Sequence, residues 1–492
     1  MTDQTVSRSR GSNVFAVVLA LLAAIFAFQL NASMLSPALA TMREELSATD
    51  AEIGLTQTAF FTAAALFSLF LPRWGDLIGR RRVMIGMLVV TIVGSVVAAL
   101  ATNVTMLFVG RVVQGVSGPI VPMCLIMLRV QILDQKRYAT LLGVLTAVNG
   151  GIAGVDALAG GWLAEHFGFR SIFWVMAVVG LVAVVAIRFA TVESTATETP
   201  PMDWKGVVPL VIALGTVLTA FNEAGKLGEA NWPIVAVLIV AGIAAFAVFW
   251  RIEHHSAHPL VSTTYMRQRR TWALLLTTLL TMTGVFAVMN GLIPNFAQDS
   301  AVGAGIHADT VSWVTLTPYA LAGLVMGPIA GRLAASLGYK RVLQIGLIGT
   351  AFGLGIAVLV VDEPSGAMLL FISTFIGITY AGISNIMLNG LGIVLSPKDN
   401  QGYLPGMNSG AFNLGAGLSF AILFAVNTFL TTNFGAEAGY RGGVLTGAAI
   451  LLLAFAVSFL IPSEIPDSEV EREDAAVVGA NARQERKARG AA

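Results

Sequence analysis

The sequence contains little charge and almost no cysteine. Only 12% of its 492 residues are Asp, Glu, Lys or Arg, about half the fraction found in ordinary globular domains. The formal net charge is +1, and this near-neutral balance gives no reason to expect a nucleic-acid partner. The single cysteine, Cys124, excludes both an intramolecular disulfide and a metal site built from several cysteines.

The sequence is instead rich in apolar residues, which make up 56% of the chain. They gather in blocks of about 18–25 residues, each long enough to cross the ~30 Å hydrocarbon core of a bilayer as a helix. These blocks predict an all-α integral membrane protein. Its fourteen predicted transmembrane helices cover residues 14–36, 52–72, 82–101, 104–127, 139–163, 170–190, 204–222, 232–250, 271–294, 309–331, 341–361, 366–395, 403–430 and 441–462.

The basic residues predict how these helices are oriented. With fourteen helices, 24 of the 29 Lys and Arg residues fall on one side of the bilayer and four on the other. Because basic residues collect on the cytoplasmic side, we expect both termini, residues 1–13 and 463–492, to be cytoplasmic. We expect the protein to lie in the cell (inner or plasma) membrane. The second terminal segment is too polar to bury a core and is expected to be a disordered tail.

An internal repeat divides the chain into halves. Residues 74–83 (W-G-D-L-I-G-R-R-R-V) are similar to residues 333–342 (L-A-A-S-L-G-Y-K-R-V), and both segments follow the second helix of a half. Repeated halves around a site near the bilayer midplane are typical of secondary transporters. We therefore predict a six-helix bundle over 14–190, two extra helices within 191–270, and a second six-helix bundle over 271–462.

Two motifs in the first half carry charge in unusual places. The loop after the second helix contains Asp76, Gly79, Arg80 and Arg81. The carboxylate can accept hydrogen bonds from arginines, and the glycine permits a tight turn, so we expect a cytoplasmic gate here; the alternative is a basic loop that only sets the orientation. The fourth helix contains L-F-V-G-R-V-V-Q-G around Arg111. A guanidinium within the membrane needs a partner or water, unless it reaches the interface.

On these motifs the chain resembles the major facilitator superfamily over about residues 14–462, and specifically its branch of fourteen-helix drug–proton antiporters. The loop motif is similar to the family's G-x-x-x-D-R-x-G-R-R, and the helix motif to its R-x-x-Q-G. The resemblance implies a transporter and not an enzyme. It implies that a small organic solute moves by alternating access, driven by a proton gradient with no other cofactor.

Two positions depart from the pattern of that branch. Its first helix usually carries an acidic residue where this chain has Asn31, and its fifth usually reads G-P-x-x-G-G where residues 156–161 read D-A-L-A-G-G. A carboxylate at this depth costs on the order of 3 kcal/mol. Asp156, Arg111 and Asn31 have similar predicted depths, so Asp156 and Arg111 are expected to pair. Because burial disfavours the carboxylate and a nearby cation favours it, separating the pair would move a proton; the alternative is a static ion pair.

Buried amides and hydroxyls predict the substrate cavity. Within hydrocarbon such groups must find partners or line a wet cavity, although some only join helices. Many hydrogen-bonding groups and few charges favour a neutral or singly charged organic solute. The candidates are Gln29, Asn31, Gln57, Asn149, Asn290, Tyr319, Tyr380, Asn385, Asn389 and Asn413.

The expected function is proton-coupled transport of a small organic solute. Efflux of drugs or metabolites comes first from the family resemblance. The main alternative is uptake of a polar metabolite, such as a nucleoside, by proton symport, and the third is a sensor or lipid flippase on the same scaffold. No metal site is expected, because His254, His255 and His258 lie in a polar loop without a carboxylate framework, which favours solvated histidines. The expected partners are the solute, protons and the lipid bilayer, and we expect a monomer.

Overall fold

A computed structural model describes residues 14–132, 141, 145, 154–194, 203–224, 230–256, 260–261, 263–361, 364–397 and 403–462. Every regular element among these residues is a helix, and thirteen of the described helices are long and apolar enough to cross a membrane. The prediction of an all-helical membrane fold is confirmed. The fifth predicted helix is described only from residue 154, from which it continues to residue 167. The two terminal segments, Asn149 and His258 lie outside the described residues.

The N-terminal half supplies the first group of helices, and two further helices follow it. This half comprises α1 (Val14–Ser33), η1 (Ser36–Ala38), α2 (Leu39–Glu45), α3 (Asp50–Ile78), α4 (Arg80–Ala99), α5 (Val104–Gln114), η2 (Gly115–Ser117), α6 (Ile120–Gln131), the helix over 154–167 and α8 (Arg170–Ala190). The inserted helices are α9 (Trp204–Ala224) and α10 (Trp232–His255), and the short α11 (Thr263–Met266) follows them.

The C-terminal half supplies the second group, in which several membrane helices are interrupted. Its elements are α12 (Arg269–Ala287), η4 (Val288–Leu292), α13 (Ile293–Gln298), α14 (Ala308–Val314), α15 (Leu316–Leu337), α16 (Tyr339–Val360), α17 (Gly366–Ile376), η5 (Gly377–Ser384), α18 (Asn385–Val394), α19 (Tyr403–Phe434) and α20 (Ala436–Ser458). The segments η4 and η5 are π-helical, a form that is often found at functional sites.

The repeated loop has the same local structure in both halves. Gly79 follows α3 with φ of 117°, and Gly338 follows α15 with φ of 84°. Each glycine donates its N–H to a carbonyl four residues earlier and accepts from the N–H four residues later. Positive φ favours glycine, so the repeat found in the sequence marks one turn used twice.

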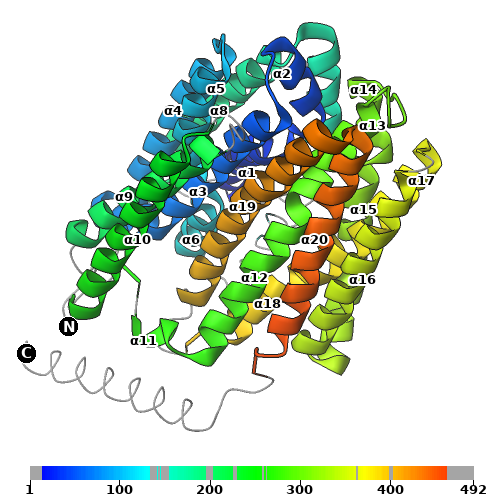
Figure 1. Ribbon diagram of the computed structural model, residues 1–492. Coiled ribbons are helices and arrows are strands. Elements are labelled where there is room, and N and C mark those ends of the chain that lie inside the picture. Colours follow the sequence, from blue (N-terminus) through cyan, green and yellow to red (C-terminus); the bar gives the residue numbers. More distant parts are fainter. Residues whose placement is uncertain are drawn as a thin grey trace, which may run out of the picture.

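The inserted pair α9–α10 lies beside α3, on the outside of the N-terminal half (Figure 1). The rings of Trp74 on α3 and Trp204 on α9 pack edge to face, with centroids 6.0 Å apart. The far side of α10 exposes large apolar side chains, among them Val237, Val240 and Ile243. Because such a surface is stable only out of water, we assign it to contact with lipid.

Candidate functional site

Arg111 is the centre of a buried polar network in the N-terminal half. Its side chain is fully buried and donates from Nη1 to Gln114 Oε1 at 2.8 Å. Its Nη2 donates to Gln57 Oε1 at 2.8 Å and to the backbone carbonyl of Asn31 at 3.0 Å. Gln114 in turn donates to Ser95 at 2.8 Å. The network therefore joins α1, α3, α4 and α5.

The charge of Arg111 is compensated by neutral groups. The Asn31 carbonyl belongs to the last turn of α1, where backbone oxygens lack partners within the helix and the helix dipole is negative. The guanidinium carbon also lies 4.2 Å from the centroid of the Phe60 ring, whose face attracts cations. A helix end, two amide oxygens and an aromatic face thus replace a carboxylate partner.

Asp156 is buried, with 2% of its surface exposed, and it binds Ser33 rather than Arg111. The Ser33 hydroxyl donates to Asp156 Oδ2 at 2.5 Å. No ion pair between Asp156 and Arg111 is present among the residues described, so the expected direct pairing was wrong. The physical reason is that α1 supplies separate partners to both groups: the Asn31 carbonyl to the cation and the Ser33 hydroxyl to the acid.

Gly160 and Gly161 bring the 154–167 helix into close contact with both halves. A Cβ at Gly160 would collide with the backbone oxygen of Met34, just after α1, and one at Gly161 with the backbone oxygen of Ala308 at the start of α14. The glycines that survive from the antiporter pattern therefore have a packing role. Asp156 lies one helical turn before Gly160 on this closely packed helix.

The two halves are joined at the predicted outer end of the bundle. The backbone N–H of Ala51 donates to Thr428 at 2.9 Å, and Gln298 donates to the backbone oxygen of Pro37 at 3.0 Å. Ser312 on α14 donates to the Ala157 carbonyl at 3.1 Å. The structure therefore represents a conformation that is closed at this end.

The other predicted cavity residues divide into three environments. Gln29 is half-buried and donates to Ser33 at 3.2 Å. In the C-terminal half, the rings of Tyr319 and Tyr380 stack 6.3 Å apart, and Asn290 and Asn413 are buried. Asn389 is exposed and bonds Asn385 on the next turn, so these two amides partly satisfy each other.

The predicted gate residues contact one another within the N-terminal half. Arg80 Nε lies 2.7 Å from Asp76 Oδ1. The Arg81 backbone N–H donates to Glu193 Oε1 at 3.0 Å, and a Cβ at Gly79 would lie 2.6 Å from that same oxygen. The loop is thus bound to the segment after α8, through a glutamate that the motif did not reveal.

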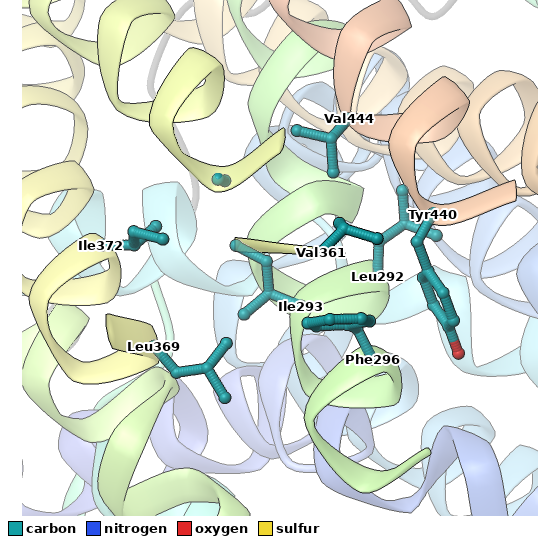
Figure 2. Close-up of a pocket in the computed structure, with 9 residues that line it drawn as sticks. Leu292, Ile293, Phe296, Val361, Leu369, Ile372, Tyr440 and Val444 are labelled. Atoms are coloured by element: carbon teal, nitrogen blue, oxygen red, sulfur yellow. The ribbon is translucent and has the colours of Figure 1, made fainter. Parts of the chain in front are cut away.

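A small apolar pocket lies in the C-terminal half, away from the predicted site residues. Figure 2 shows its lining, which includes Leu292, Ile293 and Phe296 from η4 and α13, with Val444 from α20. Only the Tyr440 hydroxyl brings an oxygen to the labelled side chains. This pocket therefore offers a polar solute few partners, whereas several amides are buried around Arg111.

Sequence reasoning missed Ser33, Gln114 and Glu193. Gln114 stood in the quoted helix motif, and its spacing of three residues from Arg111 places both on one helix face, so that signal was available. Ser33 is a common residue whose partner is 123 positions away in the sequence. Nothing local marks it.

Two bundles of membrane helices, a repeated glycine turn and a buried charged network define a secondary transporter. The profile of the Major Facilitator Superfamily matches residues 21–304 and 274–488, and the chain belongs to this superfamily. The first match extends from α1 through α13, and the second begins within α12. The chain is therefore a multi-pass membrane transporter of this family.

Individual relatives include nucleoside and multidrug transporters. The chain is 57% identical over 470 residues to the uridine/deoxyuridine transporter of Lactococcus lactis subsp. cremoris (strain MG1363), covering 94% of this chain and 98% of the relative. It is 23% identical to the multidrug resistance protein Stp of Mycobacterium tuberculosis (strain ATCC 25618 / H37Rv), covering 82% of this chain and 74% of the relative.

Solved structures support the fold. A mutant form of the nucleoside transporter NupG matches with a TM-score of 0.65 at 14% identity, covering 91% of this chain and 100% of that one. A POT family transporter in complex with 5-aminolevulinic acid also matches with a TM-score of 0.65, at 15% identity, covering 92% and 98%.

Proposed function

We propose that this protein imports uridine and deoxyuridine together with a proton. The observation that carries the proposal is the 57% identity to a uridine/deoxyuridine transporter over nearly the full length of both chains. The buried amides around Arg111 suit such a solute, because a nucleoside is neutral and rich in hydrogen-bonding groups. We place the protein in the cell membrane as a monomer with cytoplasmic termini, and with no cofactor beyond the proton gradient.

Uptake replaces efflux as the leading hypothesis. Efflux rested on resemblance to the fourteen-helix antiporter branch, and the multidrug relative Stp, which supports it, is 23% identical to this chain. The inserted helices α9 and α10 agree with that branch, but the loss of the Gly-Pro pair at Asp156 does not. Membership of the branch can thus describe ancestry while the direction of transport has changed.

Asp156 is the proposed proton site, and Ser33 is its positioning residue. The Ser33 oxygen lies 2.5 Å from Asp156 Oδ2 and 3.1 Å from the Gln29 carbonyl. A hydroxyl has one proton to donate but also accepts. It donates to Asp156 while the acid is charged. Once Asp156 is protonated, its O–H can donate to Ser33, and the Ser33 proton turns to the Gln29 carbonyl.

Arg111 contributes to coupling through α1 rather than through an ion pair. Asn31, whose carbonyl binds Arg111, is two residues from Ser33, which binds Asp156. Movement of the end of α1 would therefore affect both groups together. Asp76, Gly79, Arg80 and Arg81 form the proposed cytoplasmic gate, with Glu193 holding their loop.

Uptake of radiolabelled uridine tests this function. The gene is expressed in cells that lack their own nucleoside uptake, and the purified protein is reconstituted into liposomes with an acidic exterior. We expect accumulation above the external concentration, which collapses when a protonophore is added. Resistance to toxic compounds without uridine accumulation would instead establish efflux, and a purified protein that moves no solute would leave the sensor or flippase alternative.

A further inference from the structure

Two buried amides in the N-terminal half each have one atom without a partner, and their orientations are set by their neighbours. Asn31 donates from Nδ2 to the Ala27 carbonyl at 2.7 Å, which leaves Oδ1 as an acceptor. Gln57 accepts at Oε1 from Arg111, which leaves Nε2 as a donor. Neither Asn31 Oδ1 nor Gln57 Nε2 has a hydrogen-bond partner in the described parts of the chain.

Arg111 adds a third such atom in the same network. Its Nε is buried and likewise lacks a partner among the described residues. Its Nη2 lies 2.8 Å from Gln57 Oε1 and 3.0 Å from the Asn31 backbone oxygen, so the three residues meet around one guanidinium. Together they offer two donors and one acceptor, from side chains at most 2% exposed.

Buried polar atoms are nearly always paired, and an unpaired one is unfavourable. Three of them on residues that meet at one guanidinium favour a ligand that supplies the complementary groups. The pairing edge of uracil has one donor, N3–H, between two acceptors, O2 and O4. Cytosine instead presents an acceptor at N3 and an amino donor at C4, so two of its three groups have the wrong polarity for this set.

We propose that Asn31, Gln57 and Arg111 recognise the pairing edge of uracil, an inference that rests on the proposed import of uridine. Asn31 Oδ1 accepts from N3–H, while Gln57 Nε2 and Arg111 Nε donate to O2 and O4. Uridine and deoxyuridine share this edge and differ only at the 2′ position. The atoms are covered in the conformation closed at the outer end, so the base reaches them after that end opens.

Competition by base-modified nucleosides tests the inference on the intact protein. Inhibition of labelled uridine uptake is measured with unlabelled uridine, with 3-methyluridine, whose N3 proton is replaced, and with cytidine. A site with a buried partner for N3–H rejects an analogue that lacks it strongly, so we expect both to compete at least about 30-fold more weakly than uridine. Equal competition by 3-methyluridine in the wild-type protein would overturn the inference.

A double-mutant cycle that pairs a residue change with a change in the nucleoside tests whether Asn31 is the acceptor for N3–H. In Asn31→Ala the acceptor for N3–H is lost and space opens for the methyl group. The concentrations of uridine and of 3-methyluridine that inhibit uptake equally should then agree within about threefold, since the contact between Asn31 and N3–H is gone. The control is Asn433→Ala, which changes an exposed amide at the end of α19 and should keep the wild-type ratio. An unchanged ratio in Asn31→Ala would exclude Asn31 as the acceptor.

The two hypotheses fail in different ways. If the wild-type protein does not take up uridine, the proposed function is wrong. If it takes up uridine but accepts 3-methyluridine equally well, import stands and the base-edge assignment alone is wrong.

Discussion

Ser33 can serve both protonation states of Asp156 because its oxygen has three polar neighbours. It lies 2.5 Å from the carboxylate, 3.1 Å from the Gln29 carbonyl and 3.2 Å from Gln29 Nε2. A residue with this arrangement should influence when the acid takes up its proton, beyond holding two helices together.

The first prediction compares Ser33→Ala with Ser33→Thr. Alanine removes a hydrogen bond to the charged form of Asp156, so the neutral acid persists to higher pH. The pH at which uptake is half-maximal should rise by about one to two units, since hydrogen bonds to charged groups contribute on the order of 1.5–3 kcal/mol. Threonine keeps the hydroxyl and should keep the profile. A loss of uptake with an unchanged pH profile in Ser33→Ala would mean that the serine is only structural.

The second prediction concerns Asp156→Asn. The amide cannot release a proton, so gradient-driven accumulation of uridine should stop, while exchange of internal for external uridine continues because the solute site is intact. Proteoliposomes loaded with unlabelled uridine measure the exchange, and empty ones under a pH gradient measure the accumulation. Full accumulation by the variant would remove Asp156 from the coupling mechanism.

At the residue scale, the burial of Asp156 and Arg111 could be predicted from the sequence, but their hydrogen-bond partners could not. A charged residue in an apolar run must be buried or functional, which located Asp156 and Arg111. The sequence does not specify which groups they meet, because the Ser33 contact spans 123 positions and the Asn31 contact uses a backbone oxygen. Asn389, expected to line a buried cavity, is exposed, since a shared face with Asn385 does not say where that face points.

Among the elements, the 154–167 helix matters most because it lies between α1 of its own half and α14 of the other. Its two adjacent glycines face these two neighbours separately. Closure at the outer end therefore depends on backbone-to-backbone contact, for which any side chain is too large.

The third prediction follows from that contact. In Gly161→Ala the new methyl group collides with the Ala308 carbonyl, and overpacking of about 1–3 kcal/mol should shift the protein toward the conformation open at the outer end. Ser312→Cys places a thiol in this closed interface, where Ser312 is fully buried. The rate at which a thiol reagent labels this introduced thiol should rise by about tenfold when Gly161→Ala is added.

The matched control is Gly86→Ala on α4, where a Cβ would meet no atom within 4 Å. It should leave the labelling rate unchanged. The one native cysteine, Cys124, is buried, so the introduced thiol can be followed separately. Equal labelling of the thiol with and without Gly161→Ala would show that the glycine contact does not hold the outer end closed.

The lengths of the apolar blocks predicted where the membrane helices lie, but they did not predict where these helices end or are interrupted. The second helix was predicted over 52–72, whereas α3 extends from Asp50 to Ile78 with Pro72 inside it. Its start is set by a capping box between Thr49 and Glu52, and its end by Gly79. The π-helical segments η4 and η5 interrupt runs that read as continuous helix, because such turns are selected by packing and not by local composition.

For the whole molecule, the repeat predicts two halves, and the same glycine turn recurs after α3 and after α15. The sequence could not predict that the outer end is closed, because conformations that differ by a few kcal/mol share one sequence and one pattern of helices. It could not predict the direction of transport either, since the same scaffold serves export and import.

The fourth prediction concerns charge movement. Asp156 is the one buried carboxylate in the described parts of the two six-helix halves, since buried Glu253 belongs to the inserted α10. We therefore expect one proton for each neutral nucleoside, and an inward current of one positive charge per uridine. Current and labelled flux measured together in proteoliposomes give the ratio. A ratio of zero or two would require a different or second proton site.

A single carboxylate also limits how far the solute can be concentrated. One positive charge moving down 100 mV releases about 2.3 kcal/mol, and each 1.4 kcal/mol corresponds to a tenfold ratio. The membrane potential alone would then sustain about a 50-fold excess of nucleoside inside the cell. If Asp156 is the one proton site, the number of such sites, and not the affinity for the solute, would set how dilute a nutrient source the cell can still use.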